Sequence, residues 1–190
     1  MGKISSRKLL KETLAYEFSL YFPKRKDYIR SFILRERDFY IWKYQKTLRH
    51  LEYAKEKMNS SNSLLFKILF AYYSRKTNVL GAKLGIDTWC NVFDRGLIIH
   101  HAAGGIIINS SARIGKNCHL HGDNCIGNNG TPKGKSPHIG DNCSFGVGAK
   151  VIGDIQLGNN IIVAAGSVVV KSCTVDGVTL AGIPATIIKK

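Results

Sequence analysis

The sequence predicts a mainly β protein, a solenoid of hexapeptide repeats preceded by an α-helical N-terminal region. An aliphatic or aromatic residue recurs at every sixth position over most of residues 108–190, and a small or β-branched residue follows it four positions later. Residues 6–76 instead show helical spacing. A fixed short period specifies a solenoid whose repeats pack on their neighbours. We therefore expect short strands, three to a coil, stacked around one continuous core.

Each hexad is expected to supply one short strand and one tight turn. The residue that opens a hexad should point into the core, and these residues are Ile108, Ile114, Leu120, Ile126, Ile139, Phe145, Val151, Leu157, Val163, Val169 and Val175. The later small residue should fit a crowded corner, and this set comprises Ala112, Cys118, Cys143, Ala149, Ile155, Ile161, Ser167, Cys173, Thr179 and Ala185. Glycine supplies turn angles that a β-carbon disfavours.

The region before the repeat is predicted to be helical. Residues 6–20, 27–58 and 64–76 carry apolar residues at intervals of three and four, the middle stretch forming one or two helices. From about residue 84 the pattern changes to short β segments. We therefore expect a helical N-terminal region over residues 1–83 and a β-helix domain over residues 84–190.

One segment interrupts the repeat. Residues 128–137 read NNGTPKGKSP, which is polar, rich in Gly and Pro, and out of phase with the hexads. We interpret it as a loop extruded from one coil. Loops held by a rigid scaffold often carry binding and catalytic residues.

Composition excludes several classes of protein. The chain has no run of eighteen apolar residues and no apparent secretion signal. Its five cysteines show no CxxC spacing, and Cys118, Cys143 and Cys173 fall on small-residue positions of the repeat. We expect reduced cysteines that pack as small apolar residues in a cytoplasmic protein.

The net charge of +15 is concentrated in the helical region. Residues 1–83 hold 19 Lys and Arg against 7 Asp and Glu, whereas residues 84–190 hold 9 against 6. Solvated helix faces are the simpler interpretation. Peripheral contact with a membrane or an anionic glycan is the alternative. Nucleic acid is not expected, because no recognisable binding motif accompanies the charge.

The hexads, the extruded loop and the ending AGIPA together resemble the left-handed β-helix acyltransferases. The similarity covers residues 78–190 and is greatest for the serine acetyltransferase-like branch, which includes O-acetyltransferases of capsules and other surface polysaccharides. The resemblance implies a left-handed parallel β-helix, a homotrimer with active sites between subunits, and acetyl-CoA as the acetyl donor.

The resemblance also implies a histidine general base within GLIIHHAAGGIIIN, where the family position falls on His101. An imidazole can remove the proton of a hydroxyl as it attacks a thioester carbonyl. Adjacent His100 is the alternative. The orienting carboxylate falls on Asp87, with Asp94 as its alternative. Backbone N–H groups near residues 104–105 are the expected oxyanion donors.

The donor site is expected along the later coils, where a slender pantetheine chain needs small side chains for close approach. Similarity to the family indicates Gly148, Ala165, Gly166, Gly182, Ala185 and, for the phosphates, Lys190. His121 is expected to line the same cleft on the acceptor side.

The acceptor is where the sequence departs from serine acetyltransferases, whose loop ends in Arg-His-Pro. Here Lys135 and Ser136 occupy those two positions, and His138 lies beyond Pro137. Lys loses the planar fork with which Arg binds a carboxylate. We therefore expect a carbohydrate hydroxyl of a surface polysaccharide or its precursor, bound by Lys135, His138 and His121. Serine O-acetylation is the alternative, and a non-catalytic scaffold is the alternative from another class.

A metal is not expected to take part in the chemistry. His119 and His121 share a strand face, which raises the three-histidine zinc site found in the carbonic-anhydrase branch of this fold. The spacing in this sequence is not the pattern of that branch.

Overall fold

The computed structural model describes residues 3–61, 63–131 and 134–189. Residue 189 is described by its backbone alone. It divides into two compact units, a helical unit that ends at Leu84 and a β unit that begins at Gly85. The helical unit therefore ends one residue beyond the expected boundary.

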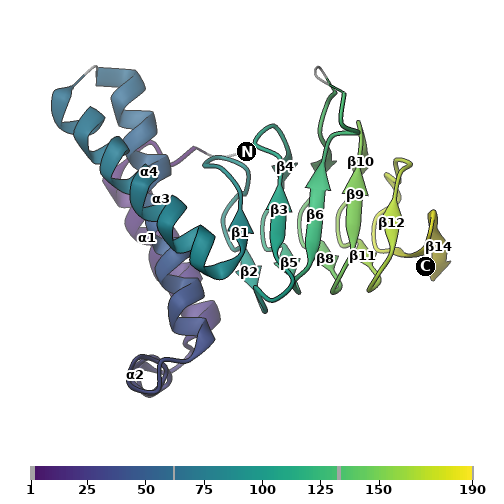
Figure 1. The fold of residues 1–190 in the computed structure, drawn as a ribbon, viewed down its shortest axis with the longest axis horizontal. Coiled ribbons are helices and arrows are strands. Elements are labelled where there is room, and N and C mark those ends of the chain that lie inside the picture. Colours follow the sequence, from purple (N-terminus) through teal and green to yellow (C-terminus); the bar gives the residue numbers. More distant parts are fainter. Residues whose placement is uncertain (1–2, 62, 132–133, 190) are drawn as a thin grey trace. The chain divides into compact units, whose positions relative to one another are not determined.

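The helical unit contains α1 (Arg7–Tyr21), α2 (Arg25–Ile33), α3 (Arg37–Ser61) and α4 (Leu64–Leu84) (Figure 1). Ser6 caps α1 by accepting a hydrogen bond from the Leu9 backbone N–H at 3.1 Å. The expected stretch 27–58 is two helices, because Arg35 adopts a left-handed φ of 54° between them. The last helix is longer than expected, by the eight residues from 77 to 84.

A buried charge network crosses the helical core. The Arg49 guanidinium donates to the Glu17 carboxylate at 2.7 Å and to the Glu52 carboxylate at 2.8 Å, and all three side chains are at most 3% exposed. The two carboxylates raise the pKa of Arg49 despite its burial. The network ties α1 to α3, since Glu17 lies on one helix and Arg49 on the other.

Helix α2 presents an unusual mixture of exposed apolar and basic side chains. Ile29, Phe32, Ile33 and the following Leu34 are between 47% and 66% exposed, and basic residues flank them at 24–26, 30, 35 and 37. Among the helices described, none is both long and apolar enough to cross a bilayer. Contact of this region with a membrane surface or an anionic glycan stays a prediction.

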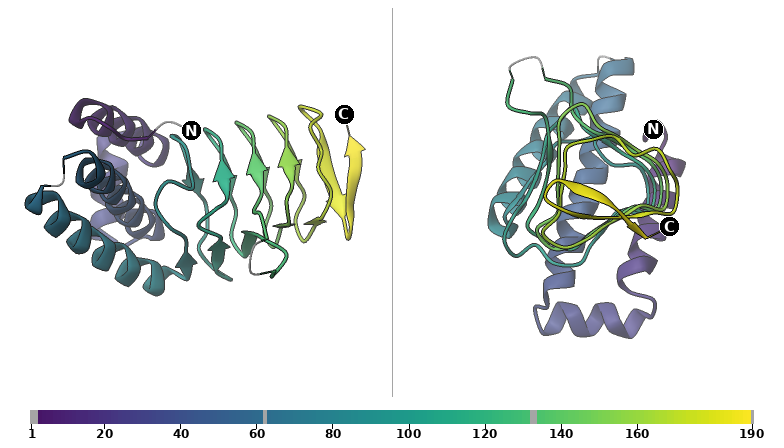
Figure 2. Two further views of the ribbon diagram at one scale, coloured as in Figure 1. Left: turned by 90° about the horizontal axis from the view of Figure 1, so that it is seen from above. Right: turned by 90° about the vertical axis from the view of Figure 1, so that its right-hand side faces the viewer.

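The β unit is a parallel β-helix whose coils outline a triangle when viewed along the axis (Figure 2). Its strands are β1 Ile86–Asp87, β2 Ile98–Ile99, β3 Ile106–Ile108, β4 Arg113–Ile114, β5 His119–Leu120, β6 Asn124–Gly127, β7 His138–Ile139, β8 Ser144–Phe145, β9 Lys150–Ile152, β10 Gln156–Leu157, β11 Ile162–Val163, β12 Val168–Val169, β13 Thr179–Gly182 and β14 Ala185–Lys189. The connection from β6 to β7 spans residues 128–137, and its described parts, 128–131 and 134–137, contain no strand.

Three sheets form the walls of the triangle. Sheet A has the order β1-β3-β6-β9-β12, sheet B has β4-β7-β10, and sheet C has β2-β5-β8-β11-β13-β14. Pairing is parallel except between β13 and β14, which form an antiparallel hairpin at the C-terminal end. Val151 pairs with Val169, three hexads later, so the sequence period sets the register between coils.

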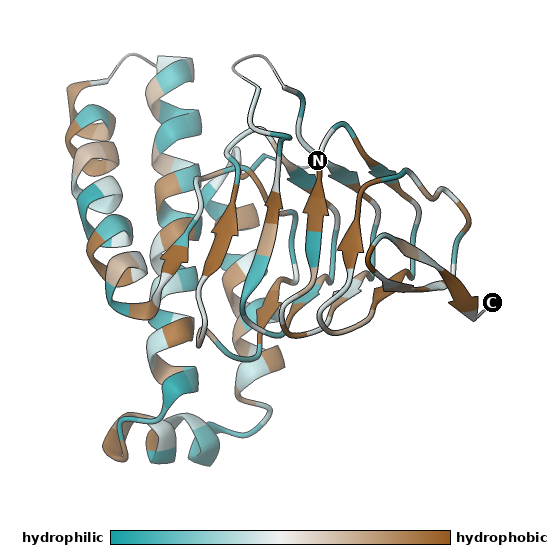
Figure 3. Ribbon diagram, turned by 45° about the vertical axis from the view of Figure 1, so that its right-hand side comes forward, coloured by the Kyte–Doolittle hydropathy of each residue, from teal (hydrophilic) through white to brown (hydrophobic). Residues whose placement is uncertain are grey.

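The core consists of the inward-pointing hexad residues, as expected. All the predicted core positions from Ile108 to Val169 are at most 6% exposed, and hydrophobic residues concentrate on the strands (Figure 3). The prediction that Val175 points into the core is wrong, because this side chain is 43% exposed. The last coil is out of phase there. Cys173 pairs with Leu157 and Leu180 pairs with Val163, so these residues continue the stacks instead.

The corner between sheets B and C is built from asparagines. Asn117, Asn142 and Asn160 adopt left-handed φ values of 53°, 57° and 55°, which asparagine tolerates better than most residues. Asn117 donates to the Asn142 side chain at 3.1 Å, and Asn142 donates to Asn160 at 3.2 Å. Gly177, with φ of 73°, follows at the next coil. We call this row the asparagine ladder.

The cysteines are free thiols. Cys118 and Cys143 are buried in neighbouring coils, and the interaction with Cys143, followed by burial, raises the pKa of the Cys118 thiol. Cys173 is half-buried. These positions agree with packing as small apolar residues.

Candidate functional site

The turns that lead from sheet C to sheet A form one continuous corner, which we call the C–A corner. It contains residues 101–105, 122–123, 146–148 and 164–166 of successive coils. The Asp123 N–H donates to the Ala103 carbonyl, the Gly148 N–H to the Gly122 carbonyl, and the Gly166 N–H to the Val147 carbonyl, at 2.8–3.2 Å. Equivalent turn residues therefore lie one above another along the axis.

Glycine is required in the first of these turns. Gly104 has a φ of 80°, and a β-carbon built on it would lie 2.8 Å from the Asp123 β-carbon. A side chain at this position would meet both steric and conformational barriers. The turn therefore brings its backbone close to Asp123. The Gly105 N–H is bonded to the Ala102 carbonyl at 3.3 Å, which leaves the Gly104 N–H as the candidate oxyanion donor.

The two candidate bases follow β2 and differ in their surroundings. His101 is exposed at the C–A corner. His100 is half-buried, its Nε2 lies 3.0 Å from Nδ1 of His119, and its ring stacks on His121 with centroids 4.2 Å apart. His100 is therefore already engaged with two other imidazoles.

Electrostatics distinguishes the two histidines further. Burial, followed by the neighbouring His121, His119 and His101, lowers the pKa of His100 to about 4. A general base works best when its pKa is near the working pH. His100 is therefore a weak base, and the assignment of His101 as the general base stays a prediction.

The candidate carboxylates lie in different places. Asp87 ends β1 and is exposed on sheet A, where it pairs in register with Ile107. Asp94 lies on sheet B instead, with its N–H bonded to the Ile114 carbonyl at 2.9 Å. Asp94 is therefore not part of the C–A corner. An orienting role for Asp87 stays a prediction.

Sequence reasoning missed Asp123, a carboxylate at the C–A corner itself. It has a left-handed φ of 50°, and its Oδ2 lies 3.9 Å from the Lys150 ammonium. The signal in the sequence was its turn position in HGDN, one coil after the HHAAGG turn. Coil stacking places Asp123 against Gly104, so a carboxylate shares the C–A corner with the candidate base.

Three of the six expected donor-binding residues, Gly148, Ala165 and Gly166, lie along the same corner, whereas Gly182 and Ala185 lie in the hairpin that ends sheet C. Gly148 and Gly166 have φ values of 75° and 67°, and no atom lies within 4 Å of a β-carbon built on Gly166. The Gly182 N–H bonds to the Ser167 hydroxyl at 3.1 Å, and Ala185 pairs with Gly182 in the last hairpin. The result is a lane of mostly small residues that begins at His101 and also carries Asp123 and the exposed Val147. Lys190 lies outside the described residues.

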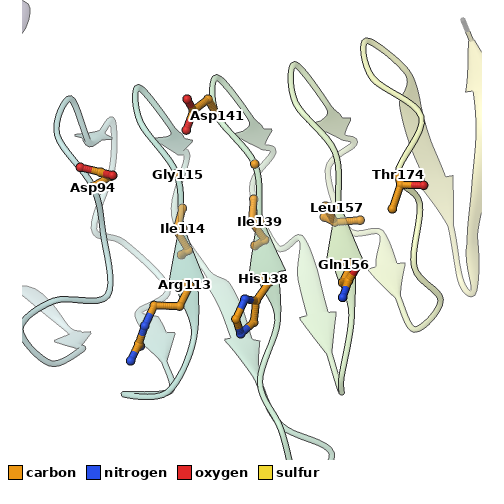
Figure 4. A pocket seen from close by; sticks show the side chains of 11 residues that line it. Asp94, Arg113, Ile114, Gly115, His138, Ile139, Asp141, Gln156, Leu157 and Thr174 are labelled. Atoms are coloured by element: carbon orange, nitrogen blue, oxygen red, sulfur yellow. The ribbon is translucent and has the colours of Figure 1, made fainter. Parts of the chain in front are cut away.

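The expected acceptor residues lie outside the C–A corner, and His121 directly follows β5. Arg113, His138 and Gln156 occupy one row on sheet B (Figure 4) and line an open pocket of about 390 Å³. The Arg113 guanidinium donates to the Ala112 carbonyl at 2.7 Å. This residue was missed by sequence reasoning, and it supplies a cation beside His138.

The end of the extruded loop also meets sheet B. Lys135 forms an exposed ion pair with Asp154 at 3.4 Å. The Ser136 hydroxyl is buried and lies 2.8 Å from the Ser111 hydroxyl. A single chain therefore does not bring Lys135 and His138 together with His101, because they belong to different walls of the triangle.

Comparison with curated proteins finds serine acetyltransferases. The chain is 36% identical over 109 residues to the enzyme of Synechococcus elongatus, a match that covers 57% of this chain and 40% of that protein. It is 35% identical over 111 residues to the enzyme of Staphylococcus aureus strain Mu50, covering 58% and 47%. The matched segment is thus less than half the length of either relative. No family model matches the chain.

Solved structures share the fold over nearly the whole chain. Serine acetyltransferase from Neisseria gonorrhoeae superposes with a TM-score of 0.67 at 21% identity, covering 96% of this chain and 69% of that one. Serine acetyltransferase from Brucella abortus in complex with coenzyme A gives a TM-score of 0.69 at 23% identity, covering 97% and 69%. The predicted left-handed parallel β-helix with a helical N-terminal region is confirmed.

Proposed function

We propose that this chain, a hexapeptide-repeat protein of the serine acetyltransferase-like branch, is an acetyl-CoA-dependent O-acetyltransferase. The observation that carries the proposal is the lane of small residues along the C–A corner, which begins at His101 and passes Gly148 and Gly166. A pantetheine arm is a narrow amide chain, and it fits where backbone is accessible and side chains are absent. The likeness to a coenzyme A complex supports the same donor.

In the proposed reaction His101 removes the proton of the acceptor hydroxyl as the oxygen attacks the thioester carbonyl. The tetrahedral intermediate then collapses and the carbon–sulfur bond breaks. The acetyl group stays on the acceptor oxygen, and the sulfur takes the proton from the His101 imidazolium and leaves as the coenzyme thiol. The Gly104 N–H is the proposed donor to the developing oxyanion. Asp87 and Asp123 are the two carboxylates proposed to stabilise the imidazolium.

The acceptor is proposed to be the hydroxyl of L-serine. The curated relatives are serine acetyltransferases, so the comparisons favour the serine alternative over the carbohydrate acceptor expected from the loop. The presence of Lys135 in place of the family's arginine does not exclude serine, because the guanidinium of Arg113 lies on sheet B beside His138. An arginine can bind the amino-acid carboxylate in two-point geometry.

The carbohydrate acceptor keeps one specific observation in its favour. Lys135 and Ser136 stand where serine acetyltransferases carry Arg-His, and the Ser136 hydroxyl is turned inward to Ser111 rather than toward a ligand. A sugar hydroxyl needs no carboxylate partner at these positions. It is therefore the second candidate.

We further propose a homotrimer in which His101 of one subunit works with sheet B of the next. The two groups of site residues lie on different walls of one chain, so a complete site requires a second copy. Co-expression of His101→Ala and His138→Ala chains with different tags tests this. Mixed trimers should regain activity that neither variant has alone, whereas no recovery would place the site within one chain.

The decisive experiment is detection of O-acetylserine by mass spectrometry after incubation with acetyl-CoA and L-serine. His101→Ala should lower kcat by about 10²–10⁴-fold, the usual contribution of a general base, whereas His50→Gln in the helical unit should keep activity. No product from protein that binds acetyl-CoA would exclude serine and leave carbohydrate acceptors. No binding of acetyl-CoA at all would support the non-catalytic scaffold.

A further inference from the structure

Three histidines outside the proposed chemistry gather on the outer face of sheet C. His100 follows β2, while His119 and His121 lie on either side of the buried Leu120 on β5. Each offers one ring nitrogen, and these three atoms lie within 4.8 Å of one another. Nineteen residues separate His100 from His119, so the cluster exists only because successive coils stack. We call it the histidine cluster.

The spacing of the cluster is close to that of a metal site. Nε2 of His100 already lies 3.0 Å from Nδ1 of His119. Nitrogens that ligate one tetrahedral zinc ion at about 2.0–2.1 Å are about 3.3 Å apart. The stacked rings of His100 and His121 are within 11° of parallel. One of them must therefore turn about χ2, a soft torsion in histidine, to direct its nitrogen at a shared ion.

The surroundings of the three imidazoles suit a metal site. Their side chains are half-buried. The Ser144 hydroxyl lies 3.3 Å from Nε2 of His121 and can orient that ring through one nitrogen while the other remains available. Such second partners are typical of ligating histidines.

We propose that His100, His119 and His121 form a three-imidazole site for a transition-metal ion of the zinc class. Imidazole nitrogens suit Zn²⁺, Ni²⁺ and Co²⁺, whereas Mg²⁺ and Ca²⁺ prefer oxygen ligands. Three protein ligands leave one tetrahedral position for water. The site lies within a single chain, and the ion takes no part in the proposed acetyl transfer.

The test is calorimetric titration of the full-length, chelator-stripped protein with ZnCl₂, with the visible absorption of bound Co²⁺ as a second readout. We expect one ion per chain. His119→Asn and, separately, His121→Gln should each weaken binding by at least about 10-fold and remove the absorption of tetrahedral Co²⁺. Circular dichroism checks that both variants fold.

His138→Ala is the matched control, because it removes an exposed histidine from another sheet of the same unit. Its zinc affinity should equal that of the unchanged protein. Equal affinity in all four proteins would overturn the proposal, since zinc would then bind elsewhere. Absence of binding to the unchanged protein would overturn it as well. Neither readout depends on acetyl transfer, so failure of the proposed function would leave this test intact.

Discussion

The lane of small residues can be tested with one substitution and a matched control. Gly166→Asn adds a side chain at the C–A corner, where no atom lies within 4 Å of the new β-carbon. Gly177→Asn adds the same side chain at the corner between sheets B and C, where the surrounding space is equally open. The φ values are 67° and 73°, so the two backbones impose nearly the same conformational cost.

The expected effects on stability are small and similar. A left-handed conformation costs about 1–2 kcal/mol for most L-residues, and asparagine adopts it more readily. Each variant should therefore lose less than about 1–2 kcal/mol, or about 2–8 °C in Tm for a chain of this size. Gly177→Asn should lose the least, because the new amide can extend the asparagine ladder from Asn160.

The expected effects on donor binding differ strongly. A side chain at position 166 would stand in the proposed path of pantetheine, and overpacking of this kind costs about 1–3 kcal/mol. That is about 5- to 150-fold in Kd for acetyl-CoA, measured by calorimetry. Gly177→Asn should leave Kd unchanged. Equal Kd values for both variants would refute the lane as the donor site.

Three further predictions concern other parts of the chain. Glu17→Gln should destabilise the helical unit by about 3–5 kcal/mol in urea unfolding, because the charge of the buried Arg49 is then only partly compensated. By comparison, the ion pair of Glu56 with Lys3 at the surface contributes about 0–1 kcal/mol to stability. In chelator-treated protein, stability should fall as pH drops from about 6.5 toward 4. The reason is that His100, whose pKa is lowered to about 4 in the folded protein, binds a proton less readily than it does in the unfolded chain. The fall in stability should be smaller in His100→Asn, and an equal fall in this variant would contradict the reasoning. Ile33→Ser should weaken binding to anionic vesicles, measured by sedimentation. Equal binding to anionic and neutral vesicles would argue against a membrane role for α2.

The β-helix was predictable because its signal is a simple period. Inward residues such as Ile126 and Val151 recur every six positions, and each must be apolar since the coil has no other core. The prediction was wrong at Val175, where the hexads change phase in the last coil. It was also incomplete at α2 and α3, since nothing in the helical spacing marks Arg35 as a left-handed residue.

The candidate site was predictable only in part. Similarity of motifs proposed His101 and the small residues of later coils, because these positions have fixed places within the hexad, and these assignments stay predictions. The same reasoning missed Asp123 and Arg113. Each is an ordinary turn or strand residue in the sequence and becomes relevant through a neighbour in another coil, Gly104 in the first case and His138 in the second.

The sequence by itself determined the fold class and the division into helical and β regions, because a periodic chain encodes its own register. The acetyltransferase activity was inferred from the resemblance of motifs and stays a proposal. Only the tertiary structure decided which distant residues meet. It placed His100 against His119 and His121, aligned the C–A corner into one lane, and separated His138 from His101 on different walls. The physical reason is coil stacking: residues one coil apart become neighbours, and the extruded loop changes how far apart in sequence those neighbours lie.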